Sequence, residues 1–276
     1  MRIFISADME GATGVVNPDQ VRHGSSEYDF GRKMQAWDVM AVVRACLDNG
    51  VEEVIVNDAH GRMINLDINT MPSSVHLVSG FPKVLEMVEG MEECDGVFFV
   101  AYHAMAGTEK AVLDHTFSAS CVHDLTLNGW RIGETGLNAF LCGALGKPVA
   151  MVTGDVAVCM EALSLLGENV VTCAVKEGRG RSSAELLHPS VTEGLLRSAT
   201  EEALHALERE VAPVFRLSPP YDVKITFNYT VQCDAASIVP GSERFSGRGL
   251  RANWNDPMDV YRWIMAVIEV ASTARW

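Results

Sequence analysis

The sequence has few basic residues for its size, and it has no long apolar run. Lys and Arg number 22 against 36 Asp and Glu, which gives a net charge of −14. An acidic chain repels phosphate groups, so we expect no nucleic-acid partner and no anionic membrane surface. No stretch approaches the roughly 20 apolar residues of a membrane-spanning helix. Asp8 comes too early for the apolar core of a signal peptide, so none is expected.

Closely spaced cysteine pairs are also missing. The seven cysteines are scattered and include no C-x-x-C pair, which excludes a four-thiolate zinc site and a redox dithiol of that form. Most of them lie among apolar residues, so we predict small buried side chains with free thiols. That pattern is typical of a reducing compartment, and the expected location is the cytoplasm.

Several catalytic motifs are absent as well. The chain contains no H-E-x-x-H helix, no G-x-S-x-G turn and no Walker loop. These absences exclude a thermolysin-type zinc site, an α/β-hydrolase nucleophile and a P-loop nucleotide site. The turn around Arg179 and Arg181 has the composition of an anion-binding turn before a helix, but a flexible loop is the simpler interpretation.

Short β-branched runs alternate with helical patterns along the first half of the chain, and this alternation predicts an α/β fold. We expect a mainly parallel central sheet covered by helices on both faces. Residues 1–180 are predicted to form the metal-binding domain and residues 181–276 a smaller C-terminal α/β lobe, although one domain is also compatible with the length. Strands are predicted at 3–7, 54–56, 75–78, 97–101, 149–152, 170–175 and 223–229. Helices are predicted at 28–48, 82–88, 134–145, 156–166, 190–208 and 257–268. A hairpin turn is predicted at Asn128-Gly129.

Polar side chains follow three of the predicted strands. Asp8 and Glu10 come after the first strand, His60 after the second and His103 after the fourth. In open parallel sheets ligands bind beyond the carboxyl ends of the strands, so these side chains are expected at one edge. Each has an ordinary alternative, because acids often begin solvated loops and a lone histidine is more often structural. Together, carboxylate and imidazole favour zinc, manganese or iron.

Two further residues are candidates with equally ordinary alternatives. Glu134 begins a predicted helix, where a carboxylate also stabilises the helix dipole. His115 either acts as a general acid/base or pairs with the neighbouring Asp114, and the sequence favours neither interpretation.

Taken together, five motifs resemble the zinc D-aminopeptidase family of bacterial dipeptide-transport operons. Their order and approximate spacing match. The resemblance covers most of the chain through about Ser183 and then thins, with departures from Leu217 to Trp276. The motifs are Ser6-Ala7-Asp8-Met9-Glu10-Gly11, Val56-Asn57-Asp58-Ala59-His60, Tyr102-His103-Ala104, Asp114-His115-Thr116 and Gly133-Glu134-Thr135-Gly136-Leu137-Asn138-Ala139.

The resemblance implies a metallo-aminopeptidase with two divalent ions per subunit, expected to be Zn²⁺. It implies that the metal ligands are Asp8, Glu10, His60, His103 and Glu134, with Asp8 as the bridging carboxylate. It implies that His115 is the catalytic residue. The substrates would be short peptides or amino-acid amides, such as D-Ala-D-Ala. The protein would form a ring-like homo-oligomer, as large as a decamer, with active sites facing an internal chamber.

Two other functions use the same residues. A metal-dependent phosphoesterase would need the same ligand set and would use Arg179 and Arg181 to bind phosphate. A non-catalytic small-molecule binding protein would retain the α/β scaffold without a working site.

Overall fold

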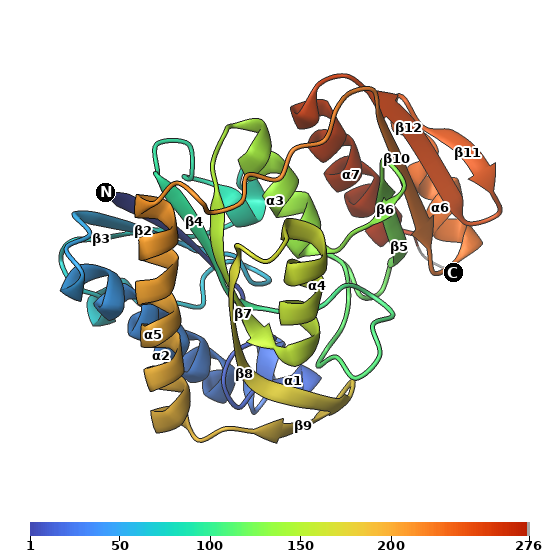
Figure 1. Cartoon of the computed structure of the whole chain (residues 1–276). Helices are drawn as coiled ribbons and strands as arrows, with labels where there is room; N and C mark the ends of the chain where they lie inside the picture. Colours follow the sequence, from blue (N-terminus) through green and yellow to red (C-terminus); the bar gives the residue numbers. More distant parts are fainter. Residues whose placement is uncertain (275–276) are drawn as a thin grey trace.

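The computed structural model describes residues 1–274 as two packed sheets with helices around them (Figure 1). The larger sheet has seven strands in the order β3-β2-β1-β4-β7-β8-β9, and all of its pairs are parallel except β8 with β9. This confirms the predicted fold class. The strands are β1 (Arg2–Ala7), β2 (Glu53–Asp58), β3 (Val75–Val78), β4 (Gly96–Tyr102), β7 (Val149–Asp155), β8 (Val171–Gly180) and β9 (Ser183–Leu186).

The second sheet is antiparallel and has the order β11-β12-β10-β5-β6. Its first hairpin turns at Asn128 and Gly129, whose φ angles are 50° and 82°. Positive φ at both central residues is the type I′ geometry predicted for this dipeptide. The strands are β5 (Val122–Leu127), β6 (Trp130–Arg131), β10 (Tyr221–Phe227), β11 (Glu243–Ser246) and β12 (Gly249–Trp254).

Helices cover both faces of the larger sheet. α2 and α5 pack side by side on one face, and α3 and α4 pack on the other (Figure 1). The helices are α1 (Pro18–Val21), α2 (Tyr28–Asp48), α3 (Glu134–Ala144), α4 (Val156–Leu166), α5 (Pro189–Glu208), α6 (Thr230–Ala236) and α7 (Pro257–Ser272), with 3-10 turns η1 (Ile68–Thr70) and η2 (Glu86–Val88).

Strand alternation divides the core between the two faces. Ile3 and Ile5 of β1 join a cluster with Val39 and Val42 of α2. Phe4 points the other way and joins a cluster that continues into Ile225 of the second sheet. Successive residues of a strand face opposite sides, so one fully buried strand supplies both clusters.

The two sheets therefore share one apolar core on the α3 and α4 side. α5 packs on the larger sheet, whereas β5 and β6 belong to the smaller one. Each sheet and the helices packed on it form a lobe, which we call the larger and the smaller lobe after their sheets. Each lobe contains residues from both the 1–180 and the 181–276 ranges. A folding boundary at residue 180 stays a prediction.

Three local predictions need correction. The helix predicted over 82–88 is only the 3-10 turn η2, whose first residue, Glu86, has a left-handed conformation (φ 48°). The helix predicted from residue 190 begins one residue earlier, at Pro189, because the His188 side chain caps it by accepting a hydrogen bond from the Ser190 N–H. The turn with Arg179 and Arg181 is the β8–β9 hairpin rather than a loop.

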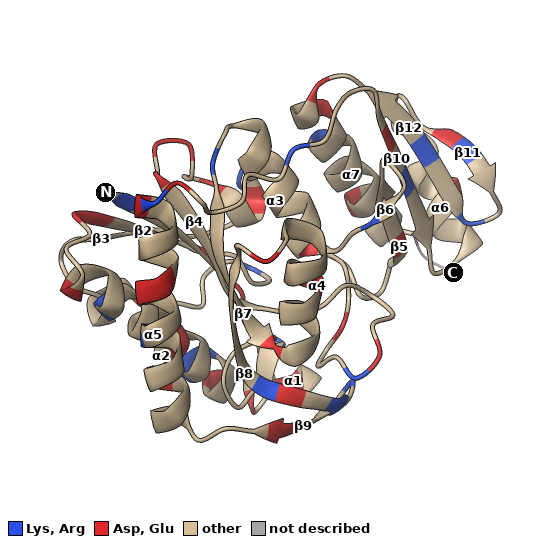
Figure 2. Ribbon diagram, in the orientation of Figure 1, with Lys and Arg blue, Asp and Glu red and all other residues tan. Residues whose placement is uncertain are grey.

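Two composition-based expectations are visible in the structure. All seven cysteines are buried and free. Acidic positions occur on helices and loops of both lobes, interspersed with fewer basic ones (Figure 2). Within residues 1–274, no helix combines the length and apolarity needed to cross a membrane.

Candidate metal centre

The candidate ligands lie at the carboxyl edge of three neighbouring parallel strands. β1 stands between β2 and β4, with Ala7 in register with Asp58 on one side and with Val100 on the other. Asp8 and Glu10 follow β1, and His60 follows β2. Because parallel strands end at the same edge, this order brings residues separated by 50 positions within contact distance.

The side chains are close enough to share cations. His60 Nδ1 lies 3.3 Å from Asp8 Oδ1 and 2.9 Å from Glu10 Oε2. His103 Nε2 lies 3.5 Å from Asp8 Oδ2 and 3.4 Å from Glu134 Oε1. Asp8 therefore contacts both histidines through different oxygens, as a bridging carboxylate would. The structure brings together all five predicted ligands.

Two groups of ligand atoms meet the distance requirement for a metal ion. One comprises Asp8, Glu10 and His103, and the other His103, His115 and Glu134, with the ligand atoms of each group within 4.8 Å of one another. Asp8 Oδ2 is buried and accepts no hydrogen bond from any described residue, and the buried Glu10 Oε2 has only the imidazole Nδ1 of His60 as a near polar neighbour among them. Buried carboxylate oxygens left without donors are costly unless a cation satisfies them, so the donor set fits zinc.

Backbone carbonyls fix the orientation of the three imidazoles. Val21 O is 2.8 Å from His60 Nε2, Ala104 O is 3.0 Å from His103 Nδ1 and Leu113 O is 2.9 Å from His115 Nδ1. A carbonyl only accepts, so each of these nitrogens donates. In the neutral form that a metal requires, the opposite nitrogen of each ring then faces the carboxylates with its lone pair, which is how protein metal sites fix imidazole ligands.

The ionisable groups perturb one another strongly. Burial, followed by the Glu10 charge, raises the pKa of Asp8 to about 7. Burial by itself would raise the pKa of Glu10 and Glu134 too, but the neighbouring imidazoles hold the pKa of both carboxyls below the ordinary value. Burial opposes charge on His60 and His103, yet the carboxylates keep the pKa of both rings well above the ordinary value. Such mutual perturbation in a cleft is typical of a functional site.

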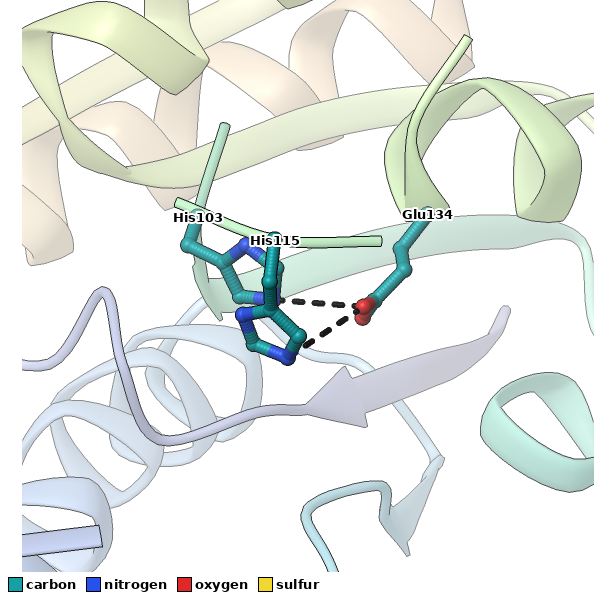
Figure 3. Close-up of side chains that lie close together, drawn as sticks. All are labelled: His103, His115 and Glu134. Atoms are coloured by element: carbon teal, nitrogen blue, oxygen red, sulfur yellow. Dashed lines mark ion pairs between the residues drawn. The ribbon is translucent and has the colours of Figure 1, made fainter. Parts of the chain in front are cut away.

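His115 lies beside His103 and turns toward the same carboxylate (Figure 3). The rings stack with centroids 3.9 Å apart and 13° between planes, and His115 Nε2 is 3.6 Å from Glu134 Oε1. Burial and then the charge of His103 lower the pKa of His115. Asp114 instead accepts hydrogen bonds from the Gly107 N–H and from Arg181. The simple pairing of His115 with Asp114 is therefore not observed.

An irregular end of β4 gives His103 its position. Ala101 has a φ of 61°, a conformation that few residues other than glycine adopt. The ladder with β7 shifts register between Phe99 and Tyr102. Gly11 approaches so closely that a Cβ there would lie 1.9 Å from Tyr102 O. The bulge thus redirects the strand at the metal site, and glycine makes the close approach of the β1 loop possible.

A cavity of about 750 Å³ opens onto the site. Its wall includes Asp8, His60, His115 and Glu134 together with side chains from η2 and from α7 of the smaller lobe. No sequence motif links these wall residues to the candidate ligands, so they could not be predicted from the sequence. They include Phe81, Glu86, Met87, Phe117, Met265, Ala266, Ile268 and Glu269.

A fully buried lysine was also missed. Lys176 is 2% exposed and follows Val175 in β8. Its signals in the sequence were a charge within an otherwise apolar strand pattern and the pair Val175-Lys176, which also resembles the family motif. Arg179 and Arg181 do not line the cavity and instead pair with Glu177, Glu185 and Asp114.

Comparison with known proteins gives consistent matches over the whole chain. A family model described as D-aminopeptidase matches residues 1–266. A D-aminopeptidase from Bacillus subtilis (strain 168) is 32% identical over 275 residues, which covers 98% of each chain. The solved structure of the Zn-dependent D-aminopeptidase DppA from Bacillus subtilis, described as a self-compartmentalizing protease, superposes with a TM-score of 0.95 at 30% identity and covers 100% of both chains.

Proposed function

This chain belongs to the D-aminopeptidase family and is a peptidase, and on that premise we propose that it is a dinuclear zinc aminopeptidase. It would remove the N-terminal residue of short peptides or amino-acid amides, with D-amino-acid peptides such as D-Ala-D-Ala as the expected class. The observation that carries the proposal is the cluster at one sheet edge of the buried Asp8, Glu10, His103 and Glu134 with the partly buried His60.

The geometry supports two ions rather than one. Glu10 and His60 lie on one side of Asp8, and His103 and Glu134 lie on the other. Each pair offers one imidazole and one carboxylate, and Asp8 has an oxygen facing each. Zinc ions bound there would supply Lewis acidity for the scissile carbonyl and would lower the pKa of a coordinated water.

His115 is the group best placed to move a proton during hydrolysis. Its Nδ1–H donates to Leu113 O, so Nε2 carries the lone pair that faces the cavity and Glu134. The lowered pKa keeps this nitrogen free at neutral pH. His115 Nε2 would take a proton as the attack proceeds and return it to the leaving amine, a role worth roughly 10²–10⁴ in rate.

The cavity wall favours a peptide over a phosphate ester. Its ionisable members among the described residues are histidines and carboxylates, with no Lys or Arg. A carboxylate-rich wall attracts the ammonium group of a free N-terminus and repels a phosphate dianion. The phosphoesterase alternative depended on Arg179 and Arg181, and their exposed ion pairs outside the cavity remove its main support. The buried ligand cluster argues against a non-catalytic binding protein.

We also propose a ring-like homo-oligomer, as large as a decamer, in the cytoplasm. The support is the description of DppA as self-compartmentalizing. Light scattering of the purified protein should give a mass that is a multiple of the 30.0 kDa chain, and a mass of one chain at micromolar concentration would contradict the ring.

Metal analysis combined with substrate chirality tests the central proposal. The purified protein should hold two zinc equivalents per chain and hydrolyse D-Ala amide faster than L-Ala amide. A chelator should abolish the activity and added zinc should restore it. Asp8→Ala should lose both equivalents, because this carboxylate contacts both sides of the site. Two equivalents retained in Asp8→Ala would exclude the bridge, and cleavage of p-nitrophenyl phosphate in preference to amides would exclude the peptidase assignment.

A further inference from the structure

Lys176 lies fully buried beside the loop that carries one of the metal ligands. Its Nζ donates to Glu10 O at 2.6 Å, Ala12 O at 2.8 Å and Val15 O at 2.6 Å. A lysine ammonium has three N–H donors and no acceptor, so these contacts use its whole capacity. The three acceptors belong to one short segment, residues 10–15, which we call the Glu10 loop.

Burying an ammonium group costs solvation free energy, so contacts within the protein must offset that cost at Lys176. Among the described residues Lys176 forms no ion pair within 4.0 Å, although Asp38 and Asp155 lie near enough to favour its charge. Within hydrogen-bonding distance, backbone carbonyls alone among the described residues stabilise the ammonium group. A methionine of similar length would fill the same space without the cost of desolvation. The polar contacts to the Glu10 loop are therefore the property that distinguishes lysine here.

The contact is directed at the backbone of Glu10 and leaves the side chain free. The carbonyl of Glu10 faces Lys176, while its Oε2 lies 2.9 Å from His60 Nδ1. Two further elements hold the loop: Gly11 N–H donates to Ala101 O at 2.8 Å, and Thr13 N–H donates to Asp38 Oδ2 at 2.8 Å. Lys176 thus fixes the peptide unit next to the ligand, and the direction of the Cα–Cβ bond follows from it.

We propose that Lys176 is the positioning residue of the metal ligand Glu10. It holds the Glu10 loop in the metal-binding conformation before any ion is present. This inference rests on the proposed two-metal function. It assigns Lys176 to one half of the centre, because its contacts go to the Glu10 loop and none goes to the loops of His103 or Glu134.

The proposal predicts an asymmetric effect on metal binding. Removing a group that orients a metal ligand typically lowers the affinity for the metal by about 10- to 100-fold. In Lys176→Met, the zinc position next to Glu10 and His60 should lose affinity by about that factor. The position next to His103 and Glu134 should change much less. A general loss of stability would weaken both positions together.

Chelator competition on the whole protein measures both positions. Wild type, Lys176→Met and Lys224→Met should be titrated with zinc, and zinc content should be counted at each free concentration. Lys224 is the matched control, since it is also on a strand but its side chain is 42% exposed and pairs with Asp222 at 2.8 Å. Lys224→Met should bind two equivalents like the wild type. Lys176→Met should bind one tightly and one weakly.

The outcomes separate the two proposals. A wild type with no tight zinc would overturn the two-metal function itself. Two equally tight equivalents in Lys176→Met, or an equal loss at both, would overturn the role of Lys176 alone. If the variant does not fold, hydrogen exchange on the wild type gives an independent test. Amides of the Glu10 loop should be protected in the zinc-free protein, and protection that appears only with zinc would contradict the inference.

Discussion

Each of the three imidazoles in the centre is oriented by a carbonyl of the chain. For His115, the acceptor is Leu113 O, two residues earlier. The ring therefore depends on its own loop for orientation and on His103 for stacking. A residue held in this way presents a single lone pair to the cavity, which suits a proton carrier and equally suits a metal ligand.

Replacing His115 decides between these roles. His115→Ala should lower kcat by roughly 10²–10⁴, because the attack loses its proton acceptor. Zinc content should stay at the wild-type value, since the five other side chains remain. Plasma emission spectrometry on the dialysed variant, paired with amide hydrolysis rates, makes the measurement. Loss of one equivalent would make His115 a ligand.

Asp38 is a buried carboxyl away from the ligands. Its Oδ2 accepts from Thr13 N–H, its Oδ1 has no hydrogen-bond donor, and burial raises its pKa from 3.8 to about 6. Between about pH 4 and 6 the folded state therefore binds more protons at Asp38 than the unfolded state does. The free energy of unfolding must then fall as the pH rises through this window.

The Asp38→Asn variant should lack this contribution. Between pH 4 and pH 7 the wild type should lose ~3 kcal/mol of unfolding free energy relative to the variant, because the pKa of Asp38 is raised by about two units. Urea titrations of the zinc-free proteins at several pH values measure it. Parallel curves would show that Asp38 titrates near its ordinary pKa.

At the level of elements, the centre depends on how closely the β1 loop approaches the end of β4. Gly11 N–H donates to Ala101 O, and a Cβ on Gly11 would lie 1.9 Å from Tyr102 O and 2.5 Å from Ala101 C. Both neighbours are backbone atoms, which cannot rotate away. The loop and the strand end must therefore separate if any side chain is added.

Gly11→Ala tests this approach. It should destabilise the fold by roughly 2 kcal/mol or more, because the clash involves backbone. It should also lower the affinity for zinc, since Glu10 and His103 flank the contact. Gly194→Ala in α5 is the control: nothing lies within 4 Å of its Cβ position, and alanine there should be neutral or stabilising by up to about 1 kcal/mol. Urea midpoints and zinc titrations compare the two, and equal behaviour would contradict the close-packing argument.

At the scale of the whole molecule, the two lobes meet around the cavity. The strand ends of the larger sheet and the start of α3 supply the proposed metal ligands, and α7 of the smaller lobe supplies Met265, Ala266, Ile268 and Glu269 to the wall. A substrate bound in this cavity would lie between a polar floor and a mainly apolar helix face. Specificity for the side chain and length of the peptide is expected to reside in the smaller lobe.

Filling this wall should affect binding without affecting the metal. Ala266→Phe places a phenyl ring in the cavity and should raise KM for a dipeptide amide by about tenfold or more, at unchanged zinc content. Arg262→Phe, one turn earlier on α7, is the control because Arg262 is 64% exposed and does not line the cavity. An unchanged KM in Ala266→Phe would place the substrate elsewhere.

The sequence alone was sufficient for the parts that depend on local pattern. The period of apolar residues predicted the parallel strands and most helices, and Asn128-Gly129 predicted its hairpin turn. These residues could be assigned to one edge because the carboxyl ends of parallel strands lie at the same edge of the sheet. They are Asp8, Glu10, His60 and His103. Glu134 and His115 were candidates with ordinary alternatives in their own contexts, and only the family resemblance favoured them as site residues.

Tertiary structure decided the contacts between distant segments that no sequence pattern indicates. Lys176 contacts a loop about 160 residues earlier in the chain, and the α7 wall lies opposite ligands from the first half. β5 and β6 pair with a sheet whose other strands lie in the last 60 residues. Period and composition report which side of a segment is buried, but they do not report against which segment it packs. The choice of packing partner is set by the competition among all compact arrangements of the chain.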